Sequence, residues 1–224
     1  MNIYYAEYDL DIKIGNNDMI AGICIEDPVS FRNFIDSIYA GLNGNESRLY
    51  ITENDKEIKL DKNIELIVNS FSIDINNKRI LAKLYQDMKD IADQEFYEDV
   101  STLNTAIVNF IDKINEKIEY PIDYKLNLDI QQLFKNYEVK IDSTNVGLPE
   151  QLLDYIKLCH KILNIRLFFL AHSEAYFSEK ELIDFFDTLK YEDVKVILIE
   201  NRFESKICNE NWWIIDKDNC LITV

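Results

Sequence analysis

The sequence MIAGICIEDPVSFRNFIDSIYAGL, residues 19–42, contains the signal for a mixed α/β fold. Residues 19–25 form an apolar run, which is typical of a strand buried on both faces. Pro28 suits the first turn of a helix, and apolar side chains then recur at helical spacing as far as the glycines at 41 and 44. Those apolar residues are Phe31, Phe34, Ile35, Ile38 and Leu42. The stretch therefore predicts a strand, a turn and a helix.

Strand and helix patterns alternate on both sides of this unit. Residues 48–52 and 57–60 predict a hairpin, and residues 64–68 predict a further strand. Towards the C-terminus, predicted helices at 148–163 and 177–189 alternate with apolar strands at 165–170 and 194–199. Ser178 and Glu181 have the spacing of a capping box. With short terminal strands at 212–215 and 221–224, the pattern favours a largely parallel sheet.

The middle of the chain has a different pattern. Residues 77–137 contain no strand-like run; two amphipathic helices, around 80–91 and 103–118, are followed by a shorter one at 128–134. We therefore expect an all-helical insertion domain, residues 71–145, within an α/β head domain made of residues 1–70 and 146–224.

Composition limits the possible functions of the chain. It has 224 residues, 47% of them hydrophobic, and a net charge of −17, which argues against generic nucleic-acid binding unless the basic residues gather on one surface. The four cysteines show no CxxC spacing, so we expect no transition-metal site. No segment approaches the roughly 18 apolar residues of a membrane span, which predicts a soluble, cytoplasmic protein without a membrane partner.

Two loops are candidates for a catalytic or nucleotide-binding site. The turn at residues 25–30, IEDPVS, lacks the glycines and lysine of a phosphate-binding loop and places Glu26 and Asp27 where phosphates would lie. We expect no nucleotide binding there, and we expect Asp27 to cap the following helix. His172, Ser173 and Glu174 follow a predicted strand; they suit either an acid/base or nucleophilic site or the turn that precedes the Ser178 helix.

An acidic series runs from the second long helix into the turn at Pro121. Spacings of four and three place Asp112, Glu116 and Glu119 near one helical face, where like charges repel, and Asp123 follows. A bound calcium ion, which takes six to eight oxygen ligands, would relieve the repulsion, although nothing matches an EF-hand. A solvated acidic face is the alternative.

Several strings along the chain resemble the Csn-two family of CRISPR-associated proteins. They occur at residues 23–27, 64–68, 71–76, 138–142, 167–173, 196–202 and 213–222. The resemblance spans nearly the whole chain and rests on the arrangement of these strings, since none of them is a catalytic signature.

The resemblance implies a P-loop-ATPase-like head sheet lacking the phosphate-binding loop, with an inserted all-helical domain. It further implies a non-enzymatic homotetrameric ring that binds linear double-stranded DNA without sequence preference during spacer acquisition. Calcium in the helical region is also implied, which makes Asp112, Glu116, Glu119 and Asp123 the candidate ligands. The implied partners are DNA, further copies of the chain, the spacer integrase and the effector nuclease.

A ring reconciles DNA binding with the acidic composition, because a basic inner wall can coexist with an acidic exterior. The candidate DNA-binding residues are Lys78, Arg79, Lys83, Lys113, Lys117, Lys125, Lys135 and Lys140. Each of them also suits an ordinary solvated surface. Two other functions stay open: a metal-dependent nuclease that uses the acidic series, and a protein-interaction scaffold without DNA affinity.

Overall fold

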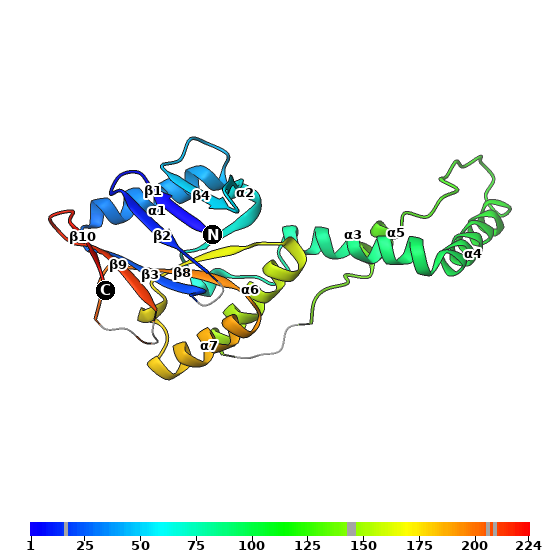
Figure 1. Cartoon of the computed structure of the whole chain (residues 1–224). Helices are drawn as coiled ribbons and strands as arrows, with labels where there is room; N and C mark the ends of the chain where they lie inside the picture. Colours follow the sequence, from blue (N-terminus) through cyan, green and yellow to red (C-terminus); the bar gives the residue numbers. More distant parts are fainter. Residues whose placement is uncertain (16–17, 143–146, 205–206, 208–209) are drawn as a thin grey trace. The chain divides into compact units, whose positions relative to one another are not determined.

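The computed structural model describes residues 1–15, 18–142, 147–204, 207 and 210–224 (Figure 1). The chain divides into two compact units. Met1–Asp74 together with Thr144–Val224 form the first unit, here called the head, and Ile75–Ser143 form the second, here called the helical unit. The predicted domain boundary at residues 145–146 lies outside the described residues. The described part contains two sheets and seven α-helices, which confirms a mixed α/β protein.

The head is built on a six-stranded sheet whose central strand is β3 (Ile20–Ile25). All six residues of β3 are buried, as the apolar run predicts. The sheet order is β10 (Leu221–Thr223), β9 (Asn211–Ile215), β3, β8 (Lys195–Glu200), β7 (Leu167–Ala171) and β6 (Ile64–Ile67). Neighbouring strands from β9 to β6 pair in parallel. The edge strand β10 pairs with β9 in the antiparallel direction.

A second, four-stranded antiparallel sheet belongs to the head. Its order is β2 (Leu10–Lys13), β1 (Asn2–Tyr5), β4 (Leu49–Glu53) and β5 (Lys56–Glu57). The predicted hairpin is β4–β5, whose turn residues Asn54 and Asp55 have φ angles of 52° and 60°. The prediction of a strand through residue 60 was wrong at its end, because Leu60 begins the short helix α2 (Leu60–Asn63).

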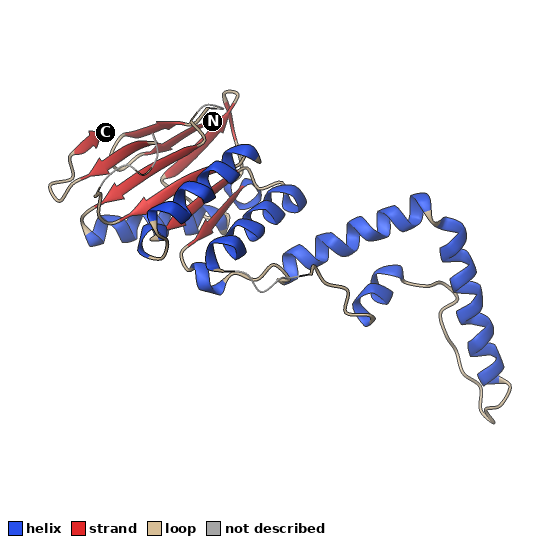
Figure 2. Ribbon diagram, turned by 90° about the horizontal axis from the view of Figure 1, so that it is seen from below, coloured by secondary structure: helices blue, strands red, loops and turns tan. Residues whose placement is uncertain are grey.

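Helices and the second sheet cover both faces of the large sheet (Figures 1 and 2). The buried side chains Phe34 and Ile38 of α1 (Pro28–Leu42) join one hydrophobic core with residues of both sheets. On the other face lie α6 (Leu148–Leu163) and α7 (Glu179–Tyr191). The capping box of Ser178 and Glu181 is present at the start of α7, which confirms that prediction.

The helical unit contains α3 (Lys78–Glu95), α4 (Tyr97–Asn115) and α5 (Ile130–Asn136), and its described residues include no strand (Figure 2). The apolar series of the second helix runs on to Ile118, but α4 ends at Asn115. Among the described residues, neither these helices nor those of the head are long and apolar enough to cross a membrane.

Gly22 provides a test of the packing at the centre of the head. It lies opposite Trp212 in the β3–β9 register, and a Cβ atom on it would lie 2.2 Å from Trp212 Cδ2. Because Trp212 is fully buried, we expect Gly22→Ala to lower the free energy of unfolding by about 1–3 kcal/mol. Urea denaturation measures this, and Gly15→Ala is the control because no heavy atom lies within 4 Å of its Cβ position. Equal midpoints for the two variants would contradict the prediction.

Candidate functional site

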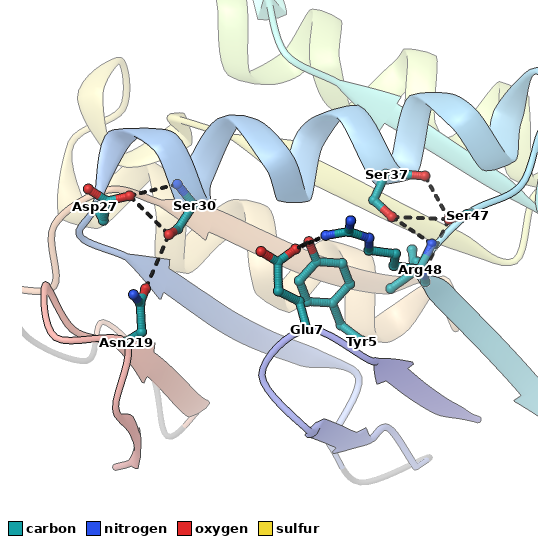
Figure 3. Close-up of polar contacts among 9 residues, drawn as sticks. Tyr5, Glu7, Asp27, Ser30, Ser37, Ser47, Arg48 and Asn219 are labelled. Atoms are coloured by element: carbon teal, nitrogen blue, oxygen red, sulfur yellow. Dashed lines mark hydrogen bonds and ion pairs between the residues drawn. The ribbon is translucent and has the colours of Figure 1, made fainter.

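The turn between β3 and α1 is filled by the chain's own carboxylate (Figure 3). Asp27 Oδ2 accepts hydrogen bonds from the backbone N of Ser30 at 2.8 Å and from its Oγ at 2.9 Å. The Ser30 hydroxyl also contacts Asn219 Oδ1 at 3.1 Å. The hydrogen bond from the Ser30 backbone lowers the pKa of Asp27. Asp27 is thus the N-cap of α1, as predicted, and it occupies the anion position that a helix N-terminus offers to a phosphate.

In the loop after β7, the hydroxyl group of Ser173 points to the carboxylate of Glu200. Ser173 Oγ donates to Glu200 Oε1 at 3.3 Å, whereas the His172 ring stacks on Phe31 with a centroid distance of 5.0 Å. His172 Nδ1 lies 3.9 Å from Glu200 Oε2. A serine–histidine nucleophilic site needs the hydroxyl to donate to the histidine ring, and Ser173 donates to Glu200 instead. Sequence reasoning missed Glu200, although it directly follows the apolar run of β8 and therefore ends at the same sheet edge as His172.

All eight candidate DNA-binding residues lie in the helical unit. Lys83 is half-buried and forms an ion pair with Asp87. The other seven are exposed. They lie in the first turn of α3, at the end of α4 and beyond it, and at and after the end of α5: Lys78, Arg79, Lys113, Lys117, Lys125, Lys135 and Lys140.

The loop that follows α4 packs back along that helix. Asn104 of α4 donates to the carbonyl of Leu126 at 3.0 Å and accepts from the backbone N of Leu128 at 2.8 Å. The hydroxyl of Tyr124 donates to Asp112. Lys125 lies between these anchored residues, so the fold brings it to the helix that carries Lys113. Among the described residues, no carboxylate lies within ion-pair distance of Lys113, Lys117 or Lys125.

The acidic series lies on the same segment. Asp112 is in the last turn of α4, Glu116 is its C-cap, and Glu119 and Asp123 are in the following loop. All four are exposed. Over the described part of the chain, no three His, Cys, Asp or Glu side chains come together in a group that could hold a metal ion. The fold of a single chain does not gather these four side chains into such a group, and calcium binding stays a prediction.

Helix α4 is amphipathic but buries none of its residues. Phe110 is 64% exposed and Tyr97 is 71% exposed, and Leu103 and Ile114 are also exposed. Globular proteins seldom leave a run of large apolar side chains on one helix in water, and such surfaces mark interaction sites. The helical unit therefore combines an exposed apolar helix with exposed lysines.

The comparisons with known proteins assign the chain to a family. The family model described as CRISPR-associated protein (Cas_Csn2) matches residues 41–219. The chain belongs to the Csn2 family. A similar protein is the CRISPR-associated protein Csn2 of Enterococcus faecalis, which is 23% identical over 205 residues, or 86% of this chain and 89% of that protein. The Csn2 match includes the whole helical unit and confirms the resemblance drawn from the sequence.

The occupied N-terminus of α1 generates a prediction about nucleotides. We expect magnesium-ATP to give no saturable heat in calorimetry, because Asp27 fills the anion position and Glu26 adds a second negative charge beside it. The Asp27→Asn variant is the control, since an amide oxygen keeps the cap without the charge. If the wild-type Csn2 family member bound ATP saturably, the assignment of this turn as a closed phosphate site would be wrong.

Proposed function

We propose that this Csn2 family member is a non-enzymatic homotetrameric ring that binds linear double-stranded DNA without sequence preference in CRISPR spacer acquisition. The observation that carries the proposal is α4, an amphipathic helix of 19 residues with no buried residue. Family membership supplies the setting in CRISPR adaptation. The spacer integrase and the effector nuclease are included as partners on family membership alone.

The exposed face of α4 supports self-association. A fully buried phenylalanine contributes about 1.5–3 kcal/mol relative to an exposed one, so the apolar side chains of α4 and its neighbours favour burial against another chain. Closed rings are a common solution when one surface must be covered by copies of the same protein. Phe96, Tyr97 and Phe110 are the residues expected at such contacts, and all three are exposed.

The lysines of the helical unit support a DNA-binding surface. Phosphate contacts by Lys and Arg give affinity without sequence information. Lys113, Lys117 and Lys125 are exposed and lie on α4 and the loop that packs on it. A net charge of −17 is unfavourable for binding a polyanion, so the proposal requires local segregation of basic side chains, which a ring can provide.

The head supports a role without catalysis. If the head is like a P-loop ATPase, the start of α1 after β3 corresponds to the position that holds phosphate there, and Asp27 caps the helix at that position. The likeness of the head to a P-loop ATPase is part of the proposal. The proposal also includes calcium binding as a prediction, at Asp112, Glu116, Glu119 and Asp123. Ring formation and DNA binding are proposed without the ion.

The first test concerns assembly. We expect the purified chain to have a native mass of four chains, and we expect Phe110→Glu to weaken association about 10–100-fold, because a buried phenylalanine is lost and a charge is introduced. Native mass spectrometry and sedimentation measure both. The control is Tyr191→Glu on α7, a head residue that is 89% exposed.

If sedimentation showed only monomers at micromolar concentration, the proposed ring would be wrong. A tetramer that tolerates Phe110→Glu as well as it tolerates Tyr191→Glu would show that α4 does not hold it together.

The second test concerns DNA. The logarithm of affinity for linear duplex should fall linearly with the logarithm of salt concentration, with a slope near −0.9 for each phosphate neutralised. Changing Lys113, Lys117 and Lys125 together to Glu should lower affinity equally for all sequences and make the slope less steep. Changing Lys56 and Lys59 to Glu is the control, because these lysines belong to the head. Gel shifts at several salt concentrations measure both effects.

Equal losses from the two sets would place DNA on another surface. Binding without divalent-dependent cleavage separates the proposal from a metal-dependent nuclease. Oligomers without DNA affinity at any salt concentration would favour a protein-interaction scaffold.

A further inference from the structure

A buried carboxylate ties the turn after β7 to the end of β8. Glu200 is the last residue of β8 and is only 4% exposed. Its Oε1 accepts hydrogen bonds from Ser173 Oγ at 3.3 Å and from the backbone N of Glu174 at 3.1 Å. Both donors belong to the 3₁₀ turn η2 (Ser173–Ala175). His172 precedes this turn as its N-cap and has a left-handed backbone with a φ of 59°. The position of this turn therefore depends on Glu200.

A second carboxyl group lies beside the first. Glu174 Oε1 is buried and has no hydrogen-bond partner among the described residues. Both carboxyl groups line one cleft of about 490 Å³. An unpaired carboxylate oxygen in such a place is costly unless the group holds a proton.

Among the described residues, the titratable and charged groups around the pair come from every neighbouring segment and include both acidic and basic side chains. They are Cys24 in β3, Glu26 after β3, His172 after β7, Arg202 and Glu204 after β8, Glu210 before β9, and Lys217 after β9. Arg202 lies 3.8 Å from Glu204, and Glu210 accepts from Trp212 Nε1 at 3.1 Å.

Protonation of the pair falls in the neutral range. Burial, with the charge of Glu200 as the next cause, raises the pKa of Glu174 to about 7. Burial raises the pKa of Glu200 to about 7 as well, against the lowering effect of its hydrogen bonds. Because the groups interact, their two protons belong to the pair rather than to either residue.

We propose that Glu174 and Glu200 form a protonation-dependent latch, which holds the turn after β7 against the end of β8 while the pair keeps a proton and loosens it when both groups are ionised. With one proton, Glu200 accepts from the turn while Glu174 is neutral. With none, two buried negative charges lie side by side among further glutamates. Loss of the last proton therefore pushes Glu174, and the turn with it, away from Glu200.

The turn connects to the entrance of the helical unit along the chain. Tyr176 follows η2, and its ring meets the Phe71 ring edge-on with a centroid distance of 5.2 Å. Phe71 belongs to η1 (Ser70–Ser72), which shortly precedes the helical unit at Ile75. A loosened turn weakens this contact. The latch stands independently of DNA binding and ring formation.

The test uses the pH dependence of thermal stability. A carboxyl group with a raised pKa in the folded chain binds its proton more tightly there than in the unfolded chain. Its contribution is complete below the ordinary value of 4.5 and is lost as the pH rises through about 7. We expect the Tm of the wild type to fall between pH 5 and pH 8. Glu174→Gln should flatten this fall and give a higher Tm than the wild type at pH 8.

Glu200→Gln should also flatten the fall of Tm with pH, because it removes one of the two titrating groups. Its amide oxygen can still accept the hydrogen bonds from the turn. Glu57→Gln, at an exposed carboxylate of β5, should follow the wild type. Parallel pH curves for the wild type and both latch variants would overturn the latch.

A local measurement separates the latch from a general effect on stability. Hydrogen exchange of a peptide covering residues 172–177 reports on the Glu174 amide, which donates to Glu200. After correction for the chemical exchange rate, we expect protection to fall between pH 6 and pH 8 in the wild type and to stay constant in Glu174→Gln. Protection that does not change with pH in the wild type would refute the proposal, whatever the melting curves show.

Discussion

Burial of β3 on both of its faces is the constraint on which the head depends. Every residue of this strand is buried, and Gly22 leaves room for the Trp212 ring on the neighbouring strand. A strand without a polar face requires an apolar layer on each side of the sheet. The chain provides α1 with the small sheet on one side, and α6 with α7 on the other (Figure 1). The parallel order then collects the carboxyl ends of β3, β7 and β8 at one edge, where Glu26, Glu174 and Glu200 line one cleft.

The helical unit is stabilised differently from the head. Its buried side chains, among the described residues, are Ile80, Tyr85 and Ile130, and none of them is on α4. Polar contacts between the loop and α4 therefore contribute much of the order in this unit, including those of Asn104 and of Tyr124 with Asp112. A unit with so little interior of its own has apolar surface to share with other chains.

The sequence predicts the head well because its strands are long apolar runs and its helices have distinct caps. Asp27, Ser178 and Glu181 act locally, so their roles follow from spacing alone. The small sheet was harder to predict, since the pairing of β1 with β4 joins residues nearly 50 positions apart in the chain, and nothing near Asn2 indicates Thr52 as its partner. Glu200 was missed for a related reason: its partners, Ser173 and Glu174, are supplied by another strand. In the helical unit, periodicity predicts the helices but cannot show which lysines face the same way.

The side chain of Asn76 fastens the two ends of the helical unit to each other. Asn76 accepts from the backbone N of Ile141 at 2.9 Å and donates to its carbonyl at 3.1 Å, so it imitates one rung of a β-ladder. Tyr85 adds a hydrogen bond to the carbonyl of Val139 at 2.9 Å. Because Asn76 and Ile141 are joined, residues 77–140 form a closed loop within the chain. The entropic cost of closing such a loop grows only with the logarithm of its length. The lengths of α3 and α4 can therefore change in evolution at little entropic cost to the fold of the head.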